Sequence, residues 1–415
     1  MSQDKNLKDL LEELTPREIA AGQHLNYSSF FGVNRVLNFA DANIPSLLFG
    51  MTPEERAFLK EISEAHLKGC DFRSRLRLED IGRQVYSDET DLDLSRFDFY
   101  GHTNGARDAI QKVVARLGEK KPGFVFYASP NWVFDKVLAG VHPNITLGNF
   151  FADSGDSFIA SLEEVTKYLK DKLLAIVIVD PANPLGYSLS QEHIERINKI
   201  QRKYGTVPIF DDVFRGLREP SERHSSSRFA ENPIIVETTS KRFGARGLGV
   251  TWTLIPKDLG LGVIPELNPE CEGCSSKAAV VANALYQTKY HDRVREWIIN
   301  NSAAFQAGYT DAFNGRPFGT FRQAFPGMPI MTFYFQPTDR IFSPAIRNRV
   351  APDLYLSSGI DWICNFDHKA SNKENHILEL AQGLSYVRIC PTKEDPSRSY
   401  IGGATFATHI QDLLK

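Results

Sequence analysis

The stretch LLAIVIVD at residues 173–180, followed by PANPLG at residues 181–186, indicates which fold the chain adopts. Its apolar run is nearly continuous, which is typical of a strand that is buried on both faces of a parallel sheet. A polar turn follows at once, and ligands of open α/β sheets bind beyond the carboxyl ends of the strands. The segment therefore predicts a buried sheet and one edge of a binding site.

Similar apolar runs occur on both sides of this stretch, at residues 123–129, 207–212, 233–240 and 248–256. The segments between them place apolar residues at helical spacing, as Ile194, Ile197 and Ile200 do. We expect these helices at residues 107–120, 158–172 and 191–204. The alternation predicts an α/β fold in which helices cover both faces of a mainly parallel sheet, in three layers (α/β/α).

The pattern changes after Cys274. A long helical stretch at residues 291–313 and a strand-like run at 329–336 indicate a second, smaller α+β domain. We expect a large domain at residues 60–290, and a small domain formed by residues 1–59 together with 291–415.

The composition is that of an ordinary globular protein, with 415 residues, 42% hydrophobic residues and a net charge of -3. There is no basic excess of the kind that nucleic acid or an anionic membrane would require. Residues 1–14 are charged and polar, and no run reaches about 18 apolar residues, so neither a signal peptide nor a membrane span is expected. We therefore expect a cytoplasmic protein.

The five cysteines are an odd number in a large chain, which favours reduced thiols over a disulfide framework. Cys271 and Cys274 have the CxxC spacing, but no second pair or nearby histidines complete a tetrahedral zinc site. No metal is expected.

Small or polar residues end four of the apolar runs. Asn183 lies in the turn after residue 180, Asp211 and Asp212 end the next run, Lys241 follows the run after that, and Gly105 follows Tyr100 after a short polar segment. Each has an ordinary alternative, such as a turn, a helix cap or a solvated lysine. Their joint order and spacing favour one shared ligand site.

Together these motifs resemble those of fold-type-I enzymes that depend on pyridoxal 5'-phosphate (PLP), in the class I/II aminotransferase family. Residues 180–186 resemble the family's Asn-Pro-x-Asn-Pro-x-Gly, residues 211–212 its Asp-(Asp/Glu), and residues 238–247 its Ser-x-Ser-Lys segment. The resemblance covers nearly the whole chain and implies the aspartate-aminotransferase fold. Residues 14–16, 34–45 and 240–245 are also similar to the aspartate 4-decarboxylase branch.

The resemblance implies a role for each of these residues. Lys241 would hold PLP as a Schiff base and would then shuttle the proton, and its cationic neighbour Arg242 would lower its pKa. Asp211 would keep the ring nitrogen protonated, with Asp212 as the fallback. Asn183 would donate to the phenolic oxygen of the cofactor.

The cofactor phosphate needs backbone N–H groups at a helix start, together with hydroxyl groups or a cation. Gly105 and the amides of Ala106 and Arg107 meet the first need, and Thr238 and Ser240 match the hydroxyl positions near the lysine.

Two further positions match the family. Trp132 stands where an aromatic stacks on the ring, although it could be an ordinary core residue. Arg388 lies in a strand whose arginine binds the substrate α-carboxylate with a bidentate fork, although a surface salt bridge is the alternative.

Three positions depart from the family. Phe214 replaces a tyrosine that contacts the cofactor's phenolic oxygen, and the lost hydroxyl predicts a higher pKa for the Schiff base. Gly249 replaces a phosphate-binding arginine, for which Arg246 is the expected substitute. Residues 68–83 contain Phe72 but no tyrosine that a partner subunit could contribute.

An amino-acid aminotransferase that uses an α-keto acid as second substrate is therefore the leading hypothesis. A PLP-dependent lyase, decarboxylase or oxidase on the same fold is the alternative, because these reactions share the Schiff base and diverge later. A catalytically silent PLP-binding protein is a third hypothesis, which the presence of both Lys241 and Asp211 disfavours. The resemblance also implies a homodimer.

Overall fold

The computed structural model describes residues 77–131, 134–223, 225–245, 248–267, 276–336, 385–392 and 396–415. It also describes Ala57 and the short strands β1 (Leu37–Asn38), β11 (Leu354–Tyr355) and β12 (Ser357–Ser358). β1 and β11 pair in parallel.

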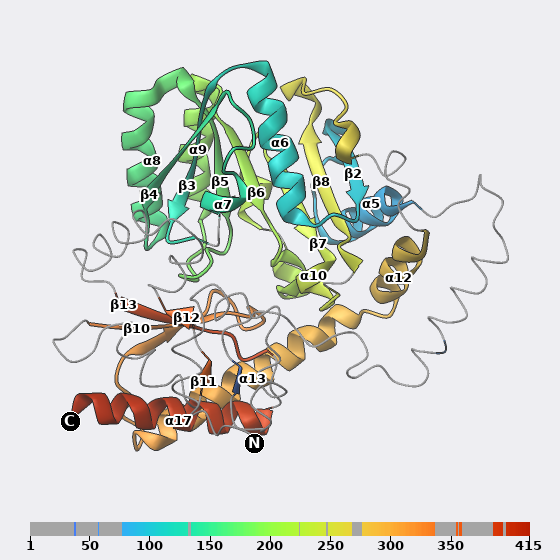
Figure 1. Cartoon of the computed structure of the whole chain (residues 1–415). Helices are drawn as coiled ribbons and strands as arrows, with labels where there is room; N and C mark the ends of the chain where they lie inside the picture. Colours follow the sequence, from blue (N-terminus) through green and yellow to red (C-terminus); the bar gives the residue numbers. More distant parts are fainter. Residues whose placement is uncertain are drawn as a thin grey trace, which may run out of the picture.

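A seven-stranded sheet forms the larger part of the molecule (Figure 1), with the strand order β2-β8-β7-β6-β5-β3-β4. Its strands are β2 (Phe97–His102), β3 (Gly123–Ser129), β4 (Ile145–Phe151), β5 (Leu173–Val179), β6 (Val207–Asp211), β7 (Ile234–Thr238) and β8 (Thr251–Pro256). β8 is antiparallel to both of its neighbours, whereas the other pairs are parallel. The prediction of a mainly parallel sheet is confirmed.

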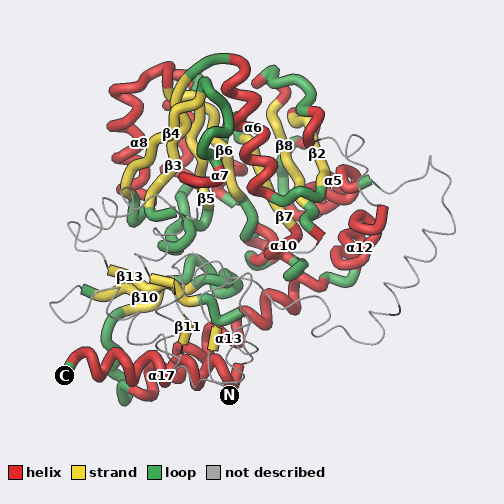
Figure 2. Tube along the Cα trace, in the orientation of Figure 1, coloured by secondary structure: helices red, strands yellow, loops and turns green. Residues whose placement is uncertain are grey.

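Each face of this sheet is covered by its own hydrophobic core. Ala175 and Val177 of β5 pack in one core with α6 (Ala106–Lys120), whereas Ile176 and Ile178 pack in the other with α8 (Gly155–Leu169) and α9 (Gln191–Tyr204). Successive strand residues point to opposite faces, so the continuous apolar run fills both cores. Figure 2 shows the resulting helix, sheet and helix layers. The three-layer prediction is confirmed.

The local sequence explains where the covering helices begin. α8 starts at Gly155, three residues earlier than expected, because Ser154 and Ser157 form a capping box in which Ser154 Oγ accepts the N–H of Ser157 at 3.2 Å. α9 has the predicted bounds and begins with an equivalent box at Ser190.

A second, four-stranded antiparallel sheet lies below the large sheet in Figure 1. The short helix α10 (Thr239–Arg242) directly follows β7 of the large sheet. The order of the second sheet is β12-β13-β10-β9, with β9 (Thr320–Arg322), β10 (Met331–Phe335) and β13 (Ser385–Ile389). The helices α13 (Tyr290–Ala312) and α17 (Pro396–Leu414) pack against it around Phe305, Phe333 and Phe406. The predicted limits of the small domain stay a prediction.

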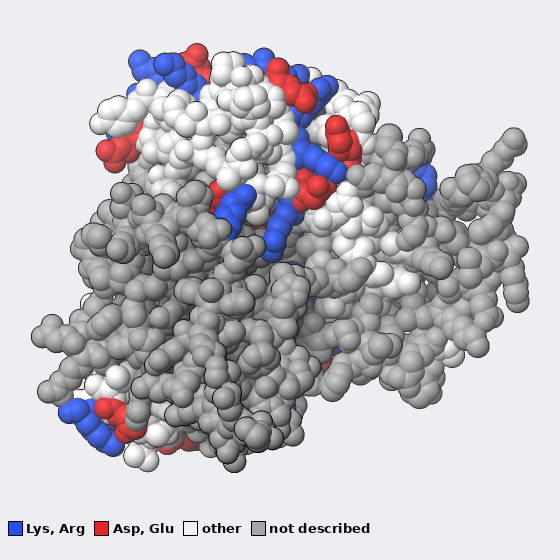
Figure 3. All heavy atoms as spheres, viewed as in Figure 1, with Lys and Arg blue, Asp and Glu red and all other residues white. Residues whose placement is uncertain are grey.

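The remaining described elements are α5 (Leu78–Glu89), α7 (Phe134–Val137), α12 (Ser276–Gln287) and short 3-10 turns, one of which, η3 (Arg215–Leu217), contains Arg215. Among the described helices, none is long and apolar enough to cross a membrane. On the face drawn in Figure 3, basic and acidic side chains are interspersed over the described surface.

Candidate active site

The predicted site residues gather at one edge of the large sheet. β5, β6 and β7 are adjacent and parallel, with Asp211 opposite Val179 on one side and Val236 on the other. Their carboxyl ends therefore meet, and Asn183, Asp211 and Lys241 all lie at or just beyond these ends. Gly105 follows β2 at the same edge.

Asp211 is buried at the end of β6, with 8% of its surface exposed. Burial and then the charge of the neighbouring Asp212 raise its pKa to about 7, although the charges of Lys241 and Arg107 lower it. Its Oδ1 atom is buried and has no hydrogen-bond partner among the described residues. A protonated ring nitrogen would give this oxygen a donor and would favour the ionised form of the carboxyl.

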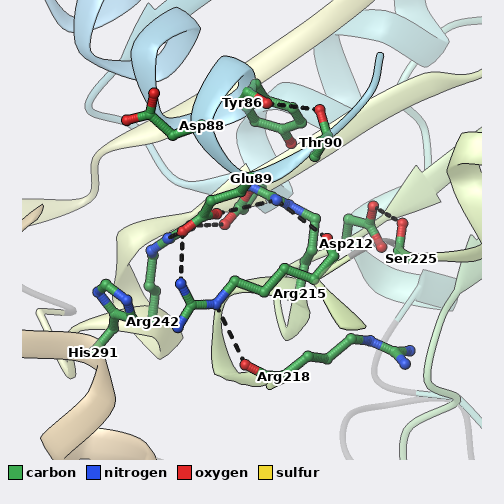
Figure 4. Close-up of polar contacts among 12 residues, drawn as sticks. Tyr86, Asp88, Glu89, Thr90, Asp212, Arg215, Arg218, Ser225, Arg242 and His291 are labelled. Atoms are coloured by element: carbon green, nitrogen blue, oxygen red, sulfur yellow. Dashed lines mark hydrogen bonds and ion pairs between the residues drawn. The ribbon is translucent and has the colours of Figure 1, made fainter. Parts of the chain in front are cut away.

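Asp212 is directed elsewhere. It is fully buried, and its Oδ2 accepts hydrogen bonds from Ser225 Oγ at 2.5 Å and Ser227 Oγ at 2.8 Å (Figure 4). Burial raises its pKa to about 6 although the Ser225 hydrogen bond lowers it. Asp212 Oδ1, like Asp211 Oδ1, has no hydrogen-bond partner among the described residues. Because two serine hydroxyls bind its other oxygen, Asp211 remains the better candidate for a ring nitrogen.

Lys241 lies in α10, a single helical turn directly after β7, and is partly exposed. Its charge acts on Asp211, so the two groups are close. The expectation that Arg242 lowers the lysine pKa stays a prediction. The Arg242 guanidinium is fully buried and forms ion pairs with Glu237 and Glu89, so carboxylates already balance its charge.

Arg246 and Trp132 lie outside the described residues, as do Phe72 and the Cys271–Cys274 pair. Their expected roles therefore stay predictions.

Gly105 and Gly249 lie side by side where the sequence predicts the phosphate side of the site. Gly105 precedes α6 with a φ of 86°, and a Cβ atom there would meet nothing within 4 Å. Its N–H donates to the Gly249 carbonyl at 3.0 Å. Gly249 has a φ of 61°, and a Cβ on it would lie 2.1 Å from the Thr103 carbonyl. An arginine cannot occupy this position, because only glycine permits so close an approach.

The two predicted hydroxyl groups have different surroundings. Thr238 caps α10: its Oγ1 accepts the N–H of Ser240 at 3.2 Å and donates to the Val250 carbonyl at 2.9 Å. Ser240 is partly exposed, with its Oγ 3.1 Å from Thr238 Oγ1. Because Thr238 already donates its proton to Val250, Ser240 is the better candidate for donating to an anion.

The first turn of α6 supplies the rest of this side. Ala106 and Arg107 begin the helix, so their backbone N–H groups lack acceptors within it. Arg107 is exposed, and its charge reaches Asp211. The 15-residue helix therefore directs its positive end at the site.

Asn183 lies in the turn after β5 and lines a small pocket. Its Oδ1 is buried without a hydrogen-bond partner among the described residues. The aromatic rings of Tyr127, Phe134 and Tyr187 line the same pocket together with Asn131. Asn131 follows β3, where its Oδ1 accepts the N–H of Phe134 at 2.8 Å and so fixes the start of α7.

Phe214 is buried, with 1% of its surface exposed, in a core that contains Leu217 and Phe243. Its ring offers no hydrogen bond, as the sequence indicates. Whether it contacts the cofactor stays a prediction.

Arg388 faces the large sheet from the second one. In β13 it lies opposite Thr332 of β10, so the two side chains share a face. Thr332 Oγ1 donates to the carbonyl of Pro184, the residue after Asn183. Arg388 is buried and its Nε donates to Cys390 Sγ at 3.2 Å. The arginine strand thus lies against the Asn183 turn.

The sequence did not predict a buried group of charged side chains that includes Arg242, the residue after Lys241. It contains Glu89, Arg215, Arg223, Glu237 and Arg242, and we call it the arginine–glutamate cluster. Figure 4 labels Glu89, Arg215 and Arg242 of this cluster. One signal was available: Glu237 is a lone charge within an apolar run, and a glutamate is almost never fully buried without a partner.

Comparison with known families decides the assignment. The family model described as aminotransferase class I and II matches residues 99–317, more than half of the chain. The chain belongs to this family. The predicted resemblance is confirmed.

Two curated members match over part of their length. The aspartate aminotransferase of Streptomyces avermitilis is 25% identical over 167 residues, which are 38% of this chain and 39% of that protein. The probable N-succinyldiaminopimelate aminotransferase DapC of Mycobacterium tuberculosis is 28% identical over 171 residues, 39% of this chain and 41% of that protein. The matches thus span about two fifths of these relatives.

Solved structures match over nearly the whole chain. Aspartate aminotransferase from Thermus thermophilus with maleate has a TM-score of 0.68 at 13% identity, covering 98% of this chain and 100% of that one. A PLP-bound putative aminotransferase from Clostridium difficile 630 has a TM-score of 0.66 at 16% identity, covering 94% and 95%. These likenesses confirm the predicted fold.

Proposed function

We propose that the chain is a PLP-dependent amino-acid aminotransferase that acts through a Schiff base on Lys241. The observation that carries the proposal is the buried Oδ1 of Asp211, which lacks a hydrogen-bond partner among the described residues at the edge where Lys241 lies. Buried polar groups are rarely left unpaired in a finished structure. A protonated ring nitrogen bound here would give Asp211 Oδ1 a donor, and Asn183 Nδ2 would donate to the phenolic oxygen of the same ring.

The residues at this edge fit PLP. The N-terminus of α6, open above Gly105, and Ser240 would hold the phosphate. Arg107 would add the positive charge that Gly249 cannot provide. Asp211 would face the ring nitrogen, and the Asn183 amide would face the phenolic oxygen.

When bound, PLP supplies a carbonyl that condenses with amines and a ring that accepts electrons from the substrate Cα. Asp211 would hold the proton at the ring nitrogen, because an ionised buried carboxyl is stabilised by a cation beside it. The Nζ of Lys241, once released, would take the proton from the substrate Cα as general base and return it to the cofactor. Arg388 would orient the substrate by its α-carboxylate.

Transamination needs an amino acid and an α-keto acid as paired substrates. The names of the curated relatives favour this reaction over a lyase, decarboxylase or oxidase, although a cystine lyase from Arabidopsis thaliana is among them, at 25% identity over 113 residues. Phe214, which replaces the family's tyrosine, is the observation that favours a lyase, decarboxylase or oxidase as the second candidate.

A half-reaction separates the two candidates. An aminotransferase incubated with one amino acid and no keto acid turns over once, releases one keto acid per site and stops until a keto acid is added. Continuous product formation from the amino acid alone would contradict the proposal and favour a lyase, decarboxylase or oxidase.

We also propose a cytoplasmic location and a homodimer. Cys390 is a reduced, buried thiol, which is compatible with a reducing compartment. Sedimentation of the purified protein tests the dimer.

A further inference from the structure

The arginine–glutamate cluster lies directly behind the lysine that the proposed function requires. Arg242 is the residue after Lys241, and its guanidinium is completely buried. Its Nη1 lies 3.1 Å from Glu237 Oε1, and its Nη2 pairs with Glu89 Oε1. In the one-turn helix α10 the two consecutive side chains point in different directions. Arg242 therefore anchors the turn while Lys241 stays partly exposed.

α10 needs such an anchor. A helix of four residues is too short to be stable by its own hydrogen bonds. Its first residue is tied to the strand region before β8, where the N–H of Thr239 donates to the Val250 carbonyl at 2.9 Å. Its last residue, Arg242, is tied by the two glutamates. The direction of the Lys241 side chain therefore depends on both ends.

Glu89 holds the cluster together. Glu89 is the last residue of α5, and its carboxylate pairs with Arg242 (Figure 4). The same carboxylate lies 3.2 Å from Arg215 Nη1 and 2.9 Å from Arg223 Nη1. Glu237 is also bound by Arg215, whose Nε lies 2.8 Å away. Losing Glu89 would thus leave Glu237 paired but would leave three arginines with one buried carboxylate.

The charges of the cluster balance once Asp292, which pairs with Arg223, is included. Three guanidinium groups meet the carboxylates of Glu89, Glu237 and Asp292, the last of which lies 2.9 Å from Arg223 Nη2. Burial alone would raise the pKa of Glu89, but Arg242, Arg215 and Arg223 outweigh it and hold the pKa at about 2.

Other charged groups nearby leave this balance unchanged. Burial, followed by Arg242, lowers the pKa of His291 to about 2, so it is neutral. Asp88 is exposed and accepts a hydrogen bond from Tyr286. The charges of Lys241 and Arg107 act instead on Asp211, where both lower the pKa of the carboxyl.

We propose that Glu89 is a positioning residue for Lys241: it fixes the buried side chain of Arg242 and balances its charge. The inference rests on the proposed function, because it concerns the lysine that would carry PLP. Glu89 touches no reacting atom. Its effect reaches the site through Arg242 and the backbone of α10.

Three variants separate charge, position and fold stability. Glu89→Gln keeps the shape of the side chain and removes its charge, whereas Glu89→Asp keeps the charge and shortens the side chain. Asp292→Asn is the matched control, since it removes the same charge from a residue that is 43% exposed and contacts Arg223 rather than Arg242. Solvent screens such a charge strongly.

The measurement is a pH titration of the PLP absorbance band in each purified variant, with the dissociation constant for PLP and the melting temperature measured alongside. We expect Glu89→Gln to lower the pKa of the Schiff base by about one pH unit, because an unbalanced cation near the lysine disfavours the protonated nitrogen. Glu89→Asp should weaken PLP binding several-fold with a smaller pKa change. Asp292→Asn should match the wild type.

A purely structural role would lower the melting temperature of Glu89→Gln but leave the Schiff-base pKa and the PLP affinity unchanged, and that result would overturn the inference. Equal shifts in Glu89→Gln and Asp292→Asn would overturn it as well. If Glu89→Gln does not fold, Glu89→Asp decides: wild-type PLP affinity and pKa would overturn the inference.

Different results would contradict the proposed function itself. If the wild type shows no band, or Lys241→Ala keeps the wild-type band, the Schiff base on Lys241 is wrong and the role of Glu89 falls with it. If the band depends on Lys241 and the Glu89 variants behave as the wild type, the role of Glu89 alone is wrong.

Discussion

The N–H of Gly105 donates to the carbonyl of Gly249 at 3.0 Å, so two segments far apart in the sequence form one side of the site. A Cβ atom on Gly249 would lie 2.1 Å from the Thr103 carbonyl. Gly249, which stands where the family resemblance implies a phosphate-binding arginine, thus holds the backbone that precedes α6.

Substituting Gly249→Ala should displace this backbone and weaken PLP binding by tenfold or more. Gly205→Ala is the matched control: Gly205 also has a positive φ, but a Cβ there would meet nothing within 4 Å. Both variants should lose about 1 kcal/mol of stability from the left-handed backbone. Titration with PLP distinguishes them, and equal affinities would contradict the role of Gly249.

The raised pKa of Asp211 predicts how the protein without cofactor responds to pH. Its carboxyl has a pKa near 7 when folded and near 3.8 as the reference, so the folded state binds the proton more tightly. Stability without PLP should fall as the pH rises from about 4 to 7, by at most about 4 kcal/mol for this group.

Asp211→Asn should remove this pH dependence. At pH 8 without PLP the variant should melt at a higher temperature than the wild type, and at pH 4 at a similar one. Asp171→Asn, at an exposed position, serves as the control. If the melting temperatures of the wild type and Asp211→Asn change with pH in parallel, the pKa of the Asp211 carboxyl is not raised in the folded protein.

Arg388→Lys should raise KM for the amino acid roughly tenfold to a hundredfold, because a lysine cannot form the bidentate pair with a carboxylate. The affinity for PLP should not change, since Arg388 reaches the site from the second sheet. Arg316→Lys, on the exposed surface, provides the comparison. An unchanged KM in Arg388→Lys would assign the substrate carboxylate to another residue.

Phe214→Tyr should lower the pKa of the Schiff base, because the new hydroxyl would donate to the cofactor's phenolic oxygen and stabilise the unprotonated form. The same absorbance titration measures it. If the pKa stays at the wild-type value while the protein remains folded, Phe214 does not lie at the cofactor ring.

Much of the large sheet could be predicted, because β5, β6 and β7 are buried on both faces and their sequences are continuously apolar. β2 and β4 were missed. They are the edge strands, and Phe150 is the one buried residue of β4, so neither strand has a long apolar run.

The positions of Asn183, Asp211 and Lys241 could also be predicted, since these residues lie within short motifs at strand ends. The arginine–glutamate cluster could not. Glu89, Arg215 and Arg242 come from three separate segments, and charged residues of this kind are usually solvated. Only the packing of α5 against the large sheet brings Glu89 to Arg242.

The central claim is that Lys241 forms the Schiff base with PLP. Borohydride reduction of the protein incubated with PLP, followed by peptide mass spectrometry, tests it most directly. The account predicts one phosphopyridoxyl group per chain, on the peptide that contains Lys241, and none after Lys241→Ala. A modified lysine elsewhere, or no modification at Lys241, would contradict it.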